Sequence, residues 1–283
     1  MKQQILRFGP RREMLGVLTE SDRGNRFGSL ALLVWNTGIS HHIGPHRLNV
    51  ELASAMSDIG LPVFRFDLSG RGDSQPRQGQ GFSVVADVSE AMNALEALGY
   101  RRFILHGLCS GAIEAHYTAH ADPRVVGLSM VDTYAYRVGS YYWHYFAKRV
   151  FHLGLWLQLV RRFGKDPGVL SEGDQFFVPF PSLERVRSDF LDFQRRNIKC
   201  HFTYSGGYDY IFNHPSQLQA MFPGLALPSF VALAHFPEAD HLFTLVEHRR
   251  RLLETLSHWV LQSFSVAEES PEKALAQIDL KSE

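Results

Sequence analysis

The sequence predicts an α/β fold in which a mostly parallel sheet is flanked by helices. Continuous apolar runs at 30–35 and 125–131 are typical of strands that are buried on both faces. Segments with apolar residues at helical spacing separate such runs, for example 47–59, which Gly60 closes. Strands that alternate with helices pair in parallel through right-handed crossovers. With 283 residues, 45% of them hydrophobic, the chain can bury one large domain with an insertion.

The individual elements follow from the same patterns. The expected strands lie at 4–8, 13–19, 30–35, 61–66, 102–105, 125–131, 198–204 and 228–233. The expected helices lie at 47–59, 82–98, 110–119, 182–196, 215–222 and 247–264. Polar or glycine-containing stretches such as 21–28 separate them as loops, and Ser182 is the expected N-cap of its helix.

The alternation of strands and helices breaks between 132 and 197. This stretch is rich in aromatic residues and is predicted to form a helical lid inserted into the domain. The core then comprises 1–131 and 198–264, and 265–283 forms a polar C-terminal tail. We expect most of the lid aromatics to pack on the sheet and the others to line a pocket beneath the lid.

A strand, a sharp turn and a helix meet at 103–117, around the sequence Gly107-Leu108-Cys109-Ser110-Gly111. A nucleophile elbow has this context, and its strained turn needs small residues two positions before and after the nucleophile. The two glycines therefore place Cys109 at the apex. With Ser110 at the apex, Leu108 would occupy one of these positions and crowd the turn. The sequence thus predicts a thiol nucleophile, although most free cysteines are simply small buried residues.

A thiol nucleophile needs a base and a third group that orients the base. In elbow-containing folds these follow in the order nucleophile, acid, histidine. Asp209 follows the strand 198–204 in a glycine-rich loop, and His241 lies in the loop before the last helix. We therefore predict Cys109, Asp209 and His241 as the catalytic residues.

Two alternatives to these partners stay open, because the chain contains 14 histidines and a coincidental match is easy. His235 is the second candidate for the base. Asp240 is a weaker candidate for the acid, because a side chain adjacent in sequence rarely reaches its neighbour's ring.

Two backbone N–H groups are expected to form an oxyanion hole. One belongs to Ser110, directly after the nucleophile, and the other to Ile39, in the loop that follows the strand 30–35. Gly38 would allow the backbone to approach closely. The start of the following helix would also favour a thiolate.

The same loop carries His41 and His42, with His46 nearby, a set that could suggest a metal ion. No cysteine or carboxylate accompanies them at ligand spacing in the sequence, so roles in loop packing are favoured. No metal and no cofactor are predicted.

Charge and composition exclude several classes of protein. The 29 basic and 29 acidic residues give a net charge of zero, which disfavours nucleic acid as the main partner. Cys109 and Cys200 alone do not make a disulfide framework. No apolar run long enough to span a membrane and no signal peptide is apparent, so a cytoplasmic protein without a membrane span is expected.

Several of these motifs together resemble the α/β-hydrolase superfamily over about residues 4–264. They are the segment Phe66-Asp67-Leu68-Ser69-Gly70-Arg71-Gly72-Asp73-Ser74, the elbow, Gly206-Gly207-x-Asp209 and Asp240-His241. Within it, Gly44-Pro45-His46-Arg47 and the elbow resemble bacterial hydrolases encoded with exosortase and exopolysaccharide systems. The chain is also similar to cysteine-bearing acyl and aminoacyl transferases of nonribosomal peptide pathways. Asn36-Thr37-Gly38 in place of the usual His-Gly, and the cysteine, disfavour a simple lipase or peptidase.

The thiol favours acyl transfer over hydrolysis. Attack of a thiol on a thioester exchanges like for like, so the acyl group can pass on to another thiol, whereas a serine ester would lie lower in energy. The expected substrate is an acyl or aminoacyl group, carried by a carrier protein or coenzyme A. Between 137 and 196 ten Lys or Arg face six Asp or Glu, an excess of four that could receive an acidic carrier. A thioesterase or esterase is the alternative, and a non-catalytic binding protein of the same fold is the second.

Overall fold

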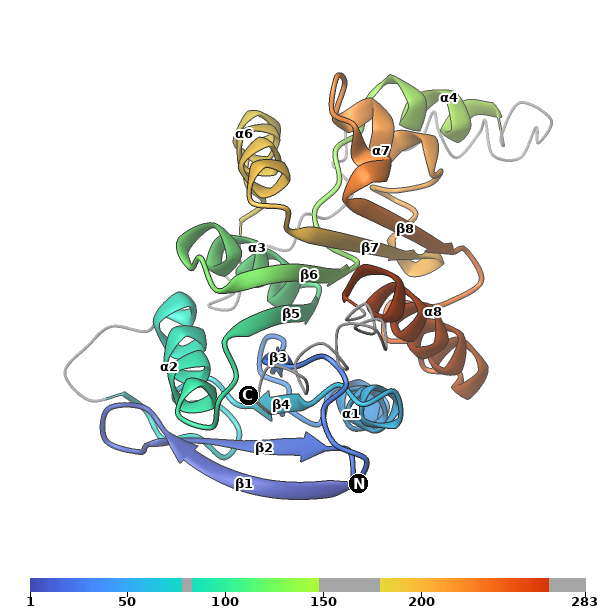
Figure 1. Cartoon of the computed structure of the whole chain (residues 1–283). Coiled ribbons are helices and arrows are strands. Elements are labelled where there is room, and N and C mark those ends of the chain that lie inside the picture. Colours follow the sequence, from blue (N-terminus) through green and yellow to red (C-terminus); the bar gives the residue numbers. More distant parts are fainter. Residues whose placement is uncertain (78–82, 148–178, 265–283) are drawn as a thin grey trace, which may run out of the picture.

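The computed structural model describes residues 1–77, 83–147 and 179–264. Within them, eight strands form one sheet in the order β1-β2-β4-β3-β5-β6-β7-β8 (Figure 1). The strands are β1 (Lys2–Phe8), β2 (Met14–Glu20), β3 (Leu30–Trp35), β4 (Val63–Phe66), β5 (Arg102–Leu108), β6 (Val125–Val131), β7 (Lys199–Ser205) and β8 (Val231–Phe236). β2 is antiparallel to β1 and β4, and every other pair is parallel. The mostly parallel sheet that the sequence predicts is confirmed.

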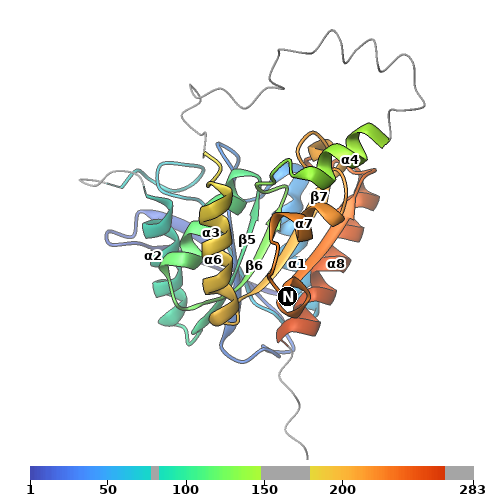
Figure 2. The same cartoon turned by 90° about the horizontal axis from the view of Figure 1, so that it is seen from above.

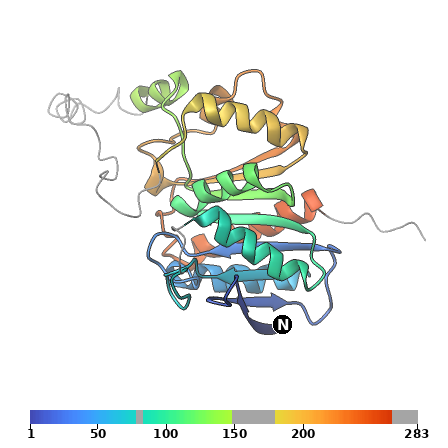
Figure 3. The ribbon, with the colours of Figure 1, turned by 90° about the vertical axis from the view of Figure 1, so that its left-hand side faces the viewer.

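Helices α2 (Val84–Glu96), α3 (Ser110–Ala121) and α6 (Leu183–Arg195) cover one face of the sheet. Figure 3 shows all three side by side over the strands. Their buried residues join the larger apolar core, to which α6 contributes Val186, Phe190 and Phe193. The side chains of Ser83 and Ser182 accept hydrogen bonds from the backbone N–H of Ala86 and Arg185, so a serine caps α2 and α6.

Helices α1 (Leu48–Asp58) and α8 (Val246–Phe264) cover the opposite face, where they form the second core with the apolar side chains of β3, β4 and β5 (Figure 2). Two smaller helices, α4 (Gly139–Ala147) and α7 (Ser216–Met221), contact each other beyond β7. Single 3-10 turns occur at η1 (Pro45–Arg47), η2 (Gly206–Tyr208) and η3 (Leu227–Ser229). No described helix is long and apolar enough to cross a membrane.

The last strand differs most from its expected position. The sequence predicts a strand at 228–233, but β8 covers Val231–Phe236. The 3-10 turn at Leu227–Ser229 explains the shift, because Pro228 provides no backbone N–H for a ladder and favours a turn. His235 consequently lies within β8, paired with Tyr204, and not in the loop that follows the strand.

The segment predicted as a lid, 132–197, is only partly described. Residues 148–178 lie outside the described residues, as does the predicted tail at 265–283. The end of the segment, α6, packs on the sheet as the crossover helix between β6 and β7, with Phe190 and Phe193 fully buried. This helix therefore belongs to a layer that covers the sheet, with Phe193 against α3 and Phe190 against β7, whereas Trp143 of α4 is 73% exposed. The lid over the rest of the segment stays a prediction.

The carboxyl ends of the parallel strands meet along one edge of the sheet. The turn after β3, the start of α3 after β5, and the loops after β6, β7 and β8 all lie there, because parallel strands share one direction. In open α/β sheets ligands bind at this edge. All the catalytic residues that the sequence predicts lie in these connections.

Candidate active site

Cys109 is the apex of the turn between β5 and α3. Its backbone has φ 55° and ψ −119°, a region that non-glycine residues rarely adopt. A Cβ on Gly107 would collide with the backbone of Gly111, and a Cβ on Gly111 would lie 3.2 Å from Oγ1 of Thr37. The glycines are thus needed where the sequence analysis expects them, and the geometry is that of a nucleophile elbow.

His241 is held by Asp132, an aspartate that sequence reasoning missed. Asp132 directly follows β6, is fully buried and has φ 47°. Its Oδ2 accepts hydrogen bonds from Nδ1 of His241 (2.8 Å) and Oγ of Ser205 (2.6 Å), and its Oδ1 accepts one from the backbone N–H of Ser205 (2.7 Å). Three donors therefore fix this carboxylate, and the carboxylate fixes the histidine ring.

The sequence prediction of Asp209 as the acid is corrected by this contact. Asp209 is exposed at the end of η2, and its carboxylate has no hydrogen-bond or ion-pair partner within the described residues. The glycines before it have another purpose: a Cβ on Gly207 would lie 2.5 Å from the backbone nitrogen of His241, and one on Gly206 would collide with Pro237. The glycine-rich loop lets the histidine loop pack closely instead of presenting an acid.

The two alternative partners lie elsewhere. The ring of His235 packs edge-on against Phe212, with 5.5 Å between ring centroids. The carboxylate of Asp240 accepts hydrogen bonds from the backbone N–H of Leu242 (2.9 Å) and from Oγ1 of Thr244 (2.9 Å), so it stabilises the turn before α8. His241 is therefore the histidine that the structure places beside the elbow.

The pKa of His241 depends on its contact with the thiol of Cys109. Burial lowers the pKa of His241, but hydrogen bonds and charge interactions with Asp132 and Cys109 outweigh this and raise it to about 10. Since Nδ1 is bonded to Asp132, the nitrogen that remains for the sulfur is Nε2. At neutral pH the ring is therefore an imidazolium, whose Nδ1–H is directed at the carboxylate and whose Nε2–H is directed at the sulfur.

Two tyrosines after β7 form a wall beside this pair. The ring of Tyr208 is nearly parallel to that of His241, with centroids 5.5 Å apart and an interplanar angle of 11°. Burial raises the pKa of both Tyr208 and Tyr210, and the charge of Cys109 raises both further. The sequence gives no signal for this role other than proximity to the expected acid.

The turn at 37–40 after β3 is tied to the elbow, because Oγ1 of Thr37 donates to the carbonyl oxygen of Leu108 (3.0 Å). The carbonyl oxygen of Gly38 accepts from Nη1 of Arg71 (2.9 Å) and Nδ2 of Asn36 (3.2 Å). In a trans peptide the N–H points opposite to the C=O. These two bonds therefore fix the direction of the Ile39 N–H. Ile39 itself is 75% exposed.

A buried carboxylate lies one helical turn beyond the elbow. Oε2 of Glu114 accepts a hydrogen bond from Nε1 of Trp35 (3.0 Å). Burial raises the pKa of Glu114 to about 7, against the opposing effects of the Trp35 bond and the charge of Arg71. This carboxyl group therefore changes its protonation state near neutral pH.

We compared the chain with known proteins. No protein-family model and no curated protein matches the sequence. Solved structures that match include an esterase domain from Rhodothermus marinus, at 18% identity and a TM-score of 0.55, covering 92% of this chain and 98% of that one. An α/β serine hydrolase without lid from Xanthomonas campestris matches at 13% identity and a TM-score of 0.57, covering 94% and 96%. The meta-cleavage product hydrolase CumD matches at 15% identity and a TM-score of 0.58, covering 92% of this chain and 98% of that one. The chain has the α/β-hydrolase fold.

Asp132 contacts His241 and Asp209 does not, so replacing each of them should affect the reactivity of the Cys109 thiol differently. With Asp132→Asn, we expect the rate of Cys109 alkylation by iodoacetamide at pH 7 to fall about tenfold, because the ring loses the charge that orients and protonates it. Intact-mass spectrometry follows the reaction, since Cys200 is fully buried. Asp209→Asn is the matched control and should react like the parent. Equal loss in both variants would contradict the assignment of Asp132.

Glu114 predicts a pH dependence of stability. Its folded pKa of about 7 exceeds the ordinary value of 4.5 for a glutamate, so the folded state binds more protons and the free energy of unfolding declines as pH rises from 4.5 to 7. Glu114→Gln removes the charge and keeps an acceptor for Trp35. We expect its melting temperature to exceed that of the parent at pH 8 and the difference to shrink below pH 4.5. The exposed Glu254→Gln variant is the control, and a difference that is constant with pH would refute the prediction.

Proposed function

We propose that the chain is an acyl-transferring enzyme whose catalytic residues are Cys109, His241 and Asp132. The observation that supports this best is the chain of contacts from the buried Asp132 through His241 to a sulfur at a strained turn. Strain of this kind persists only where the surrounding structure enforces it. A binding protein of the same fold, the second alternative, would need neither the strained apex nor the oriented imidazole.

In the proposed first half-reaction, Cys109 attacks the carbonyl carbon of a thioester, and its proton resides on His241. The carbonyl π electrons move to the oxygen, and the N–H groups of Ser110 and Ile39 donate to this oxyanion. When the tetrahedral intermediate collapses, the bond to the leaving sulfur breaks. The leaving thiolate takes the proton from Nε2, which leaves an acyl thioester on Cys109.

In the second half-reaction, His241 takes a proton from the acceptor, which attacks the acyl-cysteine and releases the thiolate of Cys109. If the acceptor is a thiol, one thioester replaces another at nearly equal free energy. If the acceptor is water, the product is a carboxylic acid, and the enzyme is a thioesterase or esterase, our second candidate function. The proposed donor is an acyl or aminoacyl thioester of coenzyme A or of a carrier protein. The steps use only groups of the chain itself.

The covalent intermediate is directly testable. We incubate the enzyme with a panel of coenzyme A and carrier-protein thioesters, and expect intact-mass spectrometry to show an acyl group on Cys109. Cys109→Ala should show none, and retained turnover in this variant would remove the mechanism. Adding pantetheine then measures how the acyl group partitions between thiol and water. Transfer predicts that most acyl groups reach the thiol, whereas release only to water selects the thioesterase.

A serine at the apex should alter this partition. Cys109→Ser forms an oxygen ester, from which return to a thiol is uphill in free energy. We expect the variant to acylate more slowly, because an alcohol is a weaker nucleophile, and to release a larger share of product to water. An unchanged partition in this variant would contradict the reason given for the cysteine.

Arg71 provides a test of the proposed oxyanion hole. Arg71→Gln removes the shorter of the two hydrogen bonds to the Gly38 carbonyl and leaves that from Asn36, so the direction of the Ile39 N–H is less tightly fixed. We expect acylation by thioesters to slow by about 10- to 100-fold, in line with the loss of one oxyanion donor. Alkylation by iodoacetamide forms no oxyanion and should keep its rate. The exposed Arg102→Gln is the control, and equal slowing of both reactions in Arg71→Gln would argue against this role.

A further inference from the structure

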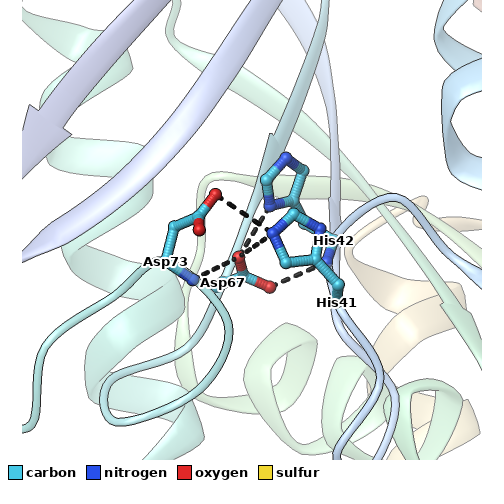
Figure 4. A group of neighbouring side chains, drawn as sticks. All are labelled: His41, His42, Asp67 and Asp73. Atoms are coloured by element: carbon cyan, nitrogen blue, oxygen red, sulfur yellow. Dashed lines mark hydrogen bonds and ion pairs between the residues drawn. The ribbon is translucent and has the colours of Figure 1, made fainter.

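A group of four possible metal ligands lies beside the turn that carries Ile39. His41 and His42 follow this turn, and Asp67 and Asp73 lie in the loop that follows β4 (Figure 4). One ligand atom from each of the four lies within 4.8 Å of the others. The sequence analysis disfavours a metal here because no carboxylate is near the histidines in sequence; the fold brings two.

The two aspartates of this group have no lysine or arginine partner within the described residues. The side chain of Asp67 is fully buried, and that of Asp73 is 56% exposed. Their ion pairs within the described residues are with His41 and His42 alone, and none is with a lysine or arginine. With neutral imidazoles the group carries two negative charges. A cation bound between the two carboxylates would balance this charge.

Several nitrogens converge on one oxygen of the buried carboxylate. Oδ2 of Asp67 lies 2.7 Å from Nδ1 of His42, 3.1 Å from the backbone nitrogen of Asp73 and 3.4 Å from Nε2 of His41. Nε2 of His41 also lies 3.0 Å from Oδ2 of Asp73. A proton on Nε2 would be divided unequally between the two carboxylates, whereas a cation between them interacts directly with both.

Backbone groups of the two loops help to hold His42 and Asp67 in place. The backbone N–H of His42 donates to Oδ1 of Asp67 (2.7 Å), and the carbonyl oxygen of His42 accepts from Nδ2 of Asn49 (3.2 Å). Gly72 has φ 50°, and a Cβ there would collide with the carboxylate of Asp67. The two loops are thus preformed around the four ligand atoms.

We propose that His41, His42, Asp67 and Asp73 form a binding site for a divalent transition-metal ion of the Zn²⁺ class. Two imidazole nitrogens and two carboxylate oxygens are a donor set that suits Zn²⁺. Bonds of about 2.0–2.1 Å require ligand atoms no more than about 4.2 Å apart, so the four atoms, which lie within 4.8 Å of one another, would adjust slightly on binding. Binding requires the ring protons to move, to Nδ1 of His41 and to Nε2 of His42. Nδ1 of His41 then gives up the hydrogen bond from the Ile43 N–H (3.3 Å).

The ion would connect two loops next to the active site. One carries Ile39, and the other carries Arg71, which holds the carbonyl of Gly38. The site therefore has a structural role, and its existence does not depend on the reaction proposed above.

Zinc binding is measured in the Cys109→Ala variant, so that the exposed thiol does not compete. Equilibrium dialysis against Zn²⁺ should show one ion per chain, with a raised melting temperature. Co²⁺ should give the intense visible absorption of a tetrahedral site. His41→Asn and Asp73→Asn, each added to this variant, should lose the ion, whereas the exposed His258→Asn should keep it. No bound Zn²⁺, or equal binding in the Asp73→Asn and parental proteins, would overturn the proposal and leave a group held by protons alone.

Discussion

The hydrogen bond between the buried Asp132 and Nδ1 of His241 is the interaction on which the site depends. It joins residues that are 109 positions apart, from the ends of β6 and β8. β7 lies between these strands, and its last residue, Ser205, donates twice to the same carboxylate. The sheet order thus determines that the carboxylate and the imidazole meet. Because Asp132 is buried, its carboxylate loses its hydrogen bonds to water, and the three donors from the protein replace them.

The other parts of the site are arranged around this bond by close backbone approach. Gly206 and Gly207 let the loop after β7 contact the histidine loop, and Gly107 lets the first turn of α3 fold back on β5. Tyr208 stacks on the imidazole from the same loop. Each of these contacts limits how far His241 can move from the sulfur. A pKa of about 10 for His241 is the electrostatic result of this confinement between a carboxylate and a thiol.

The sequence alone predicted the elbow and the histidine because both depend on local patterns. The spacing of Gly107 and Gly111 about Cys109 reflects a steric limit within one turn, and His241 precedes a well-marked last helix. The glycine-rich loop predicts an acid at Asp209, but the carboxylate that contacts the histidine is that of Asp132. Asp132 directly follows an obvious buried strand, which was the available signal, but only the order of β6, β7 and β8 shows that it reaches the histidine.

Two further features, the packing of α6 and the group of His41, His42, Asp67 and Asp73, depend on contacts between residues far apart in sequence. The apolar side of α6 is compatible in sequence with either a lid or a layer on the sheet. In the structure, Phe190 and Phe193 join the apolar core on the sheet. In the same way, Asp67 and Asp73 are far from His41 in sequence and adjacent to it in the fold. Periodicity describes which face of an element is apolar, whereas the topology decides which partner covers that face.

The titration of His241 tests the account most directly. Imidazole ¹⁵N chemical shifts, assigned with the His241→Gln variant, give its pKa in the parent and after alkylation of Cys109. The account predicts a midpoint well above 6.5, near the value of about 10, which falls once the sulfur is blocked. A midpoint near 6.5 that is the same before and after alkylation would mean that the sulfur and the imidazole do not interact, and would contradict it.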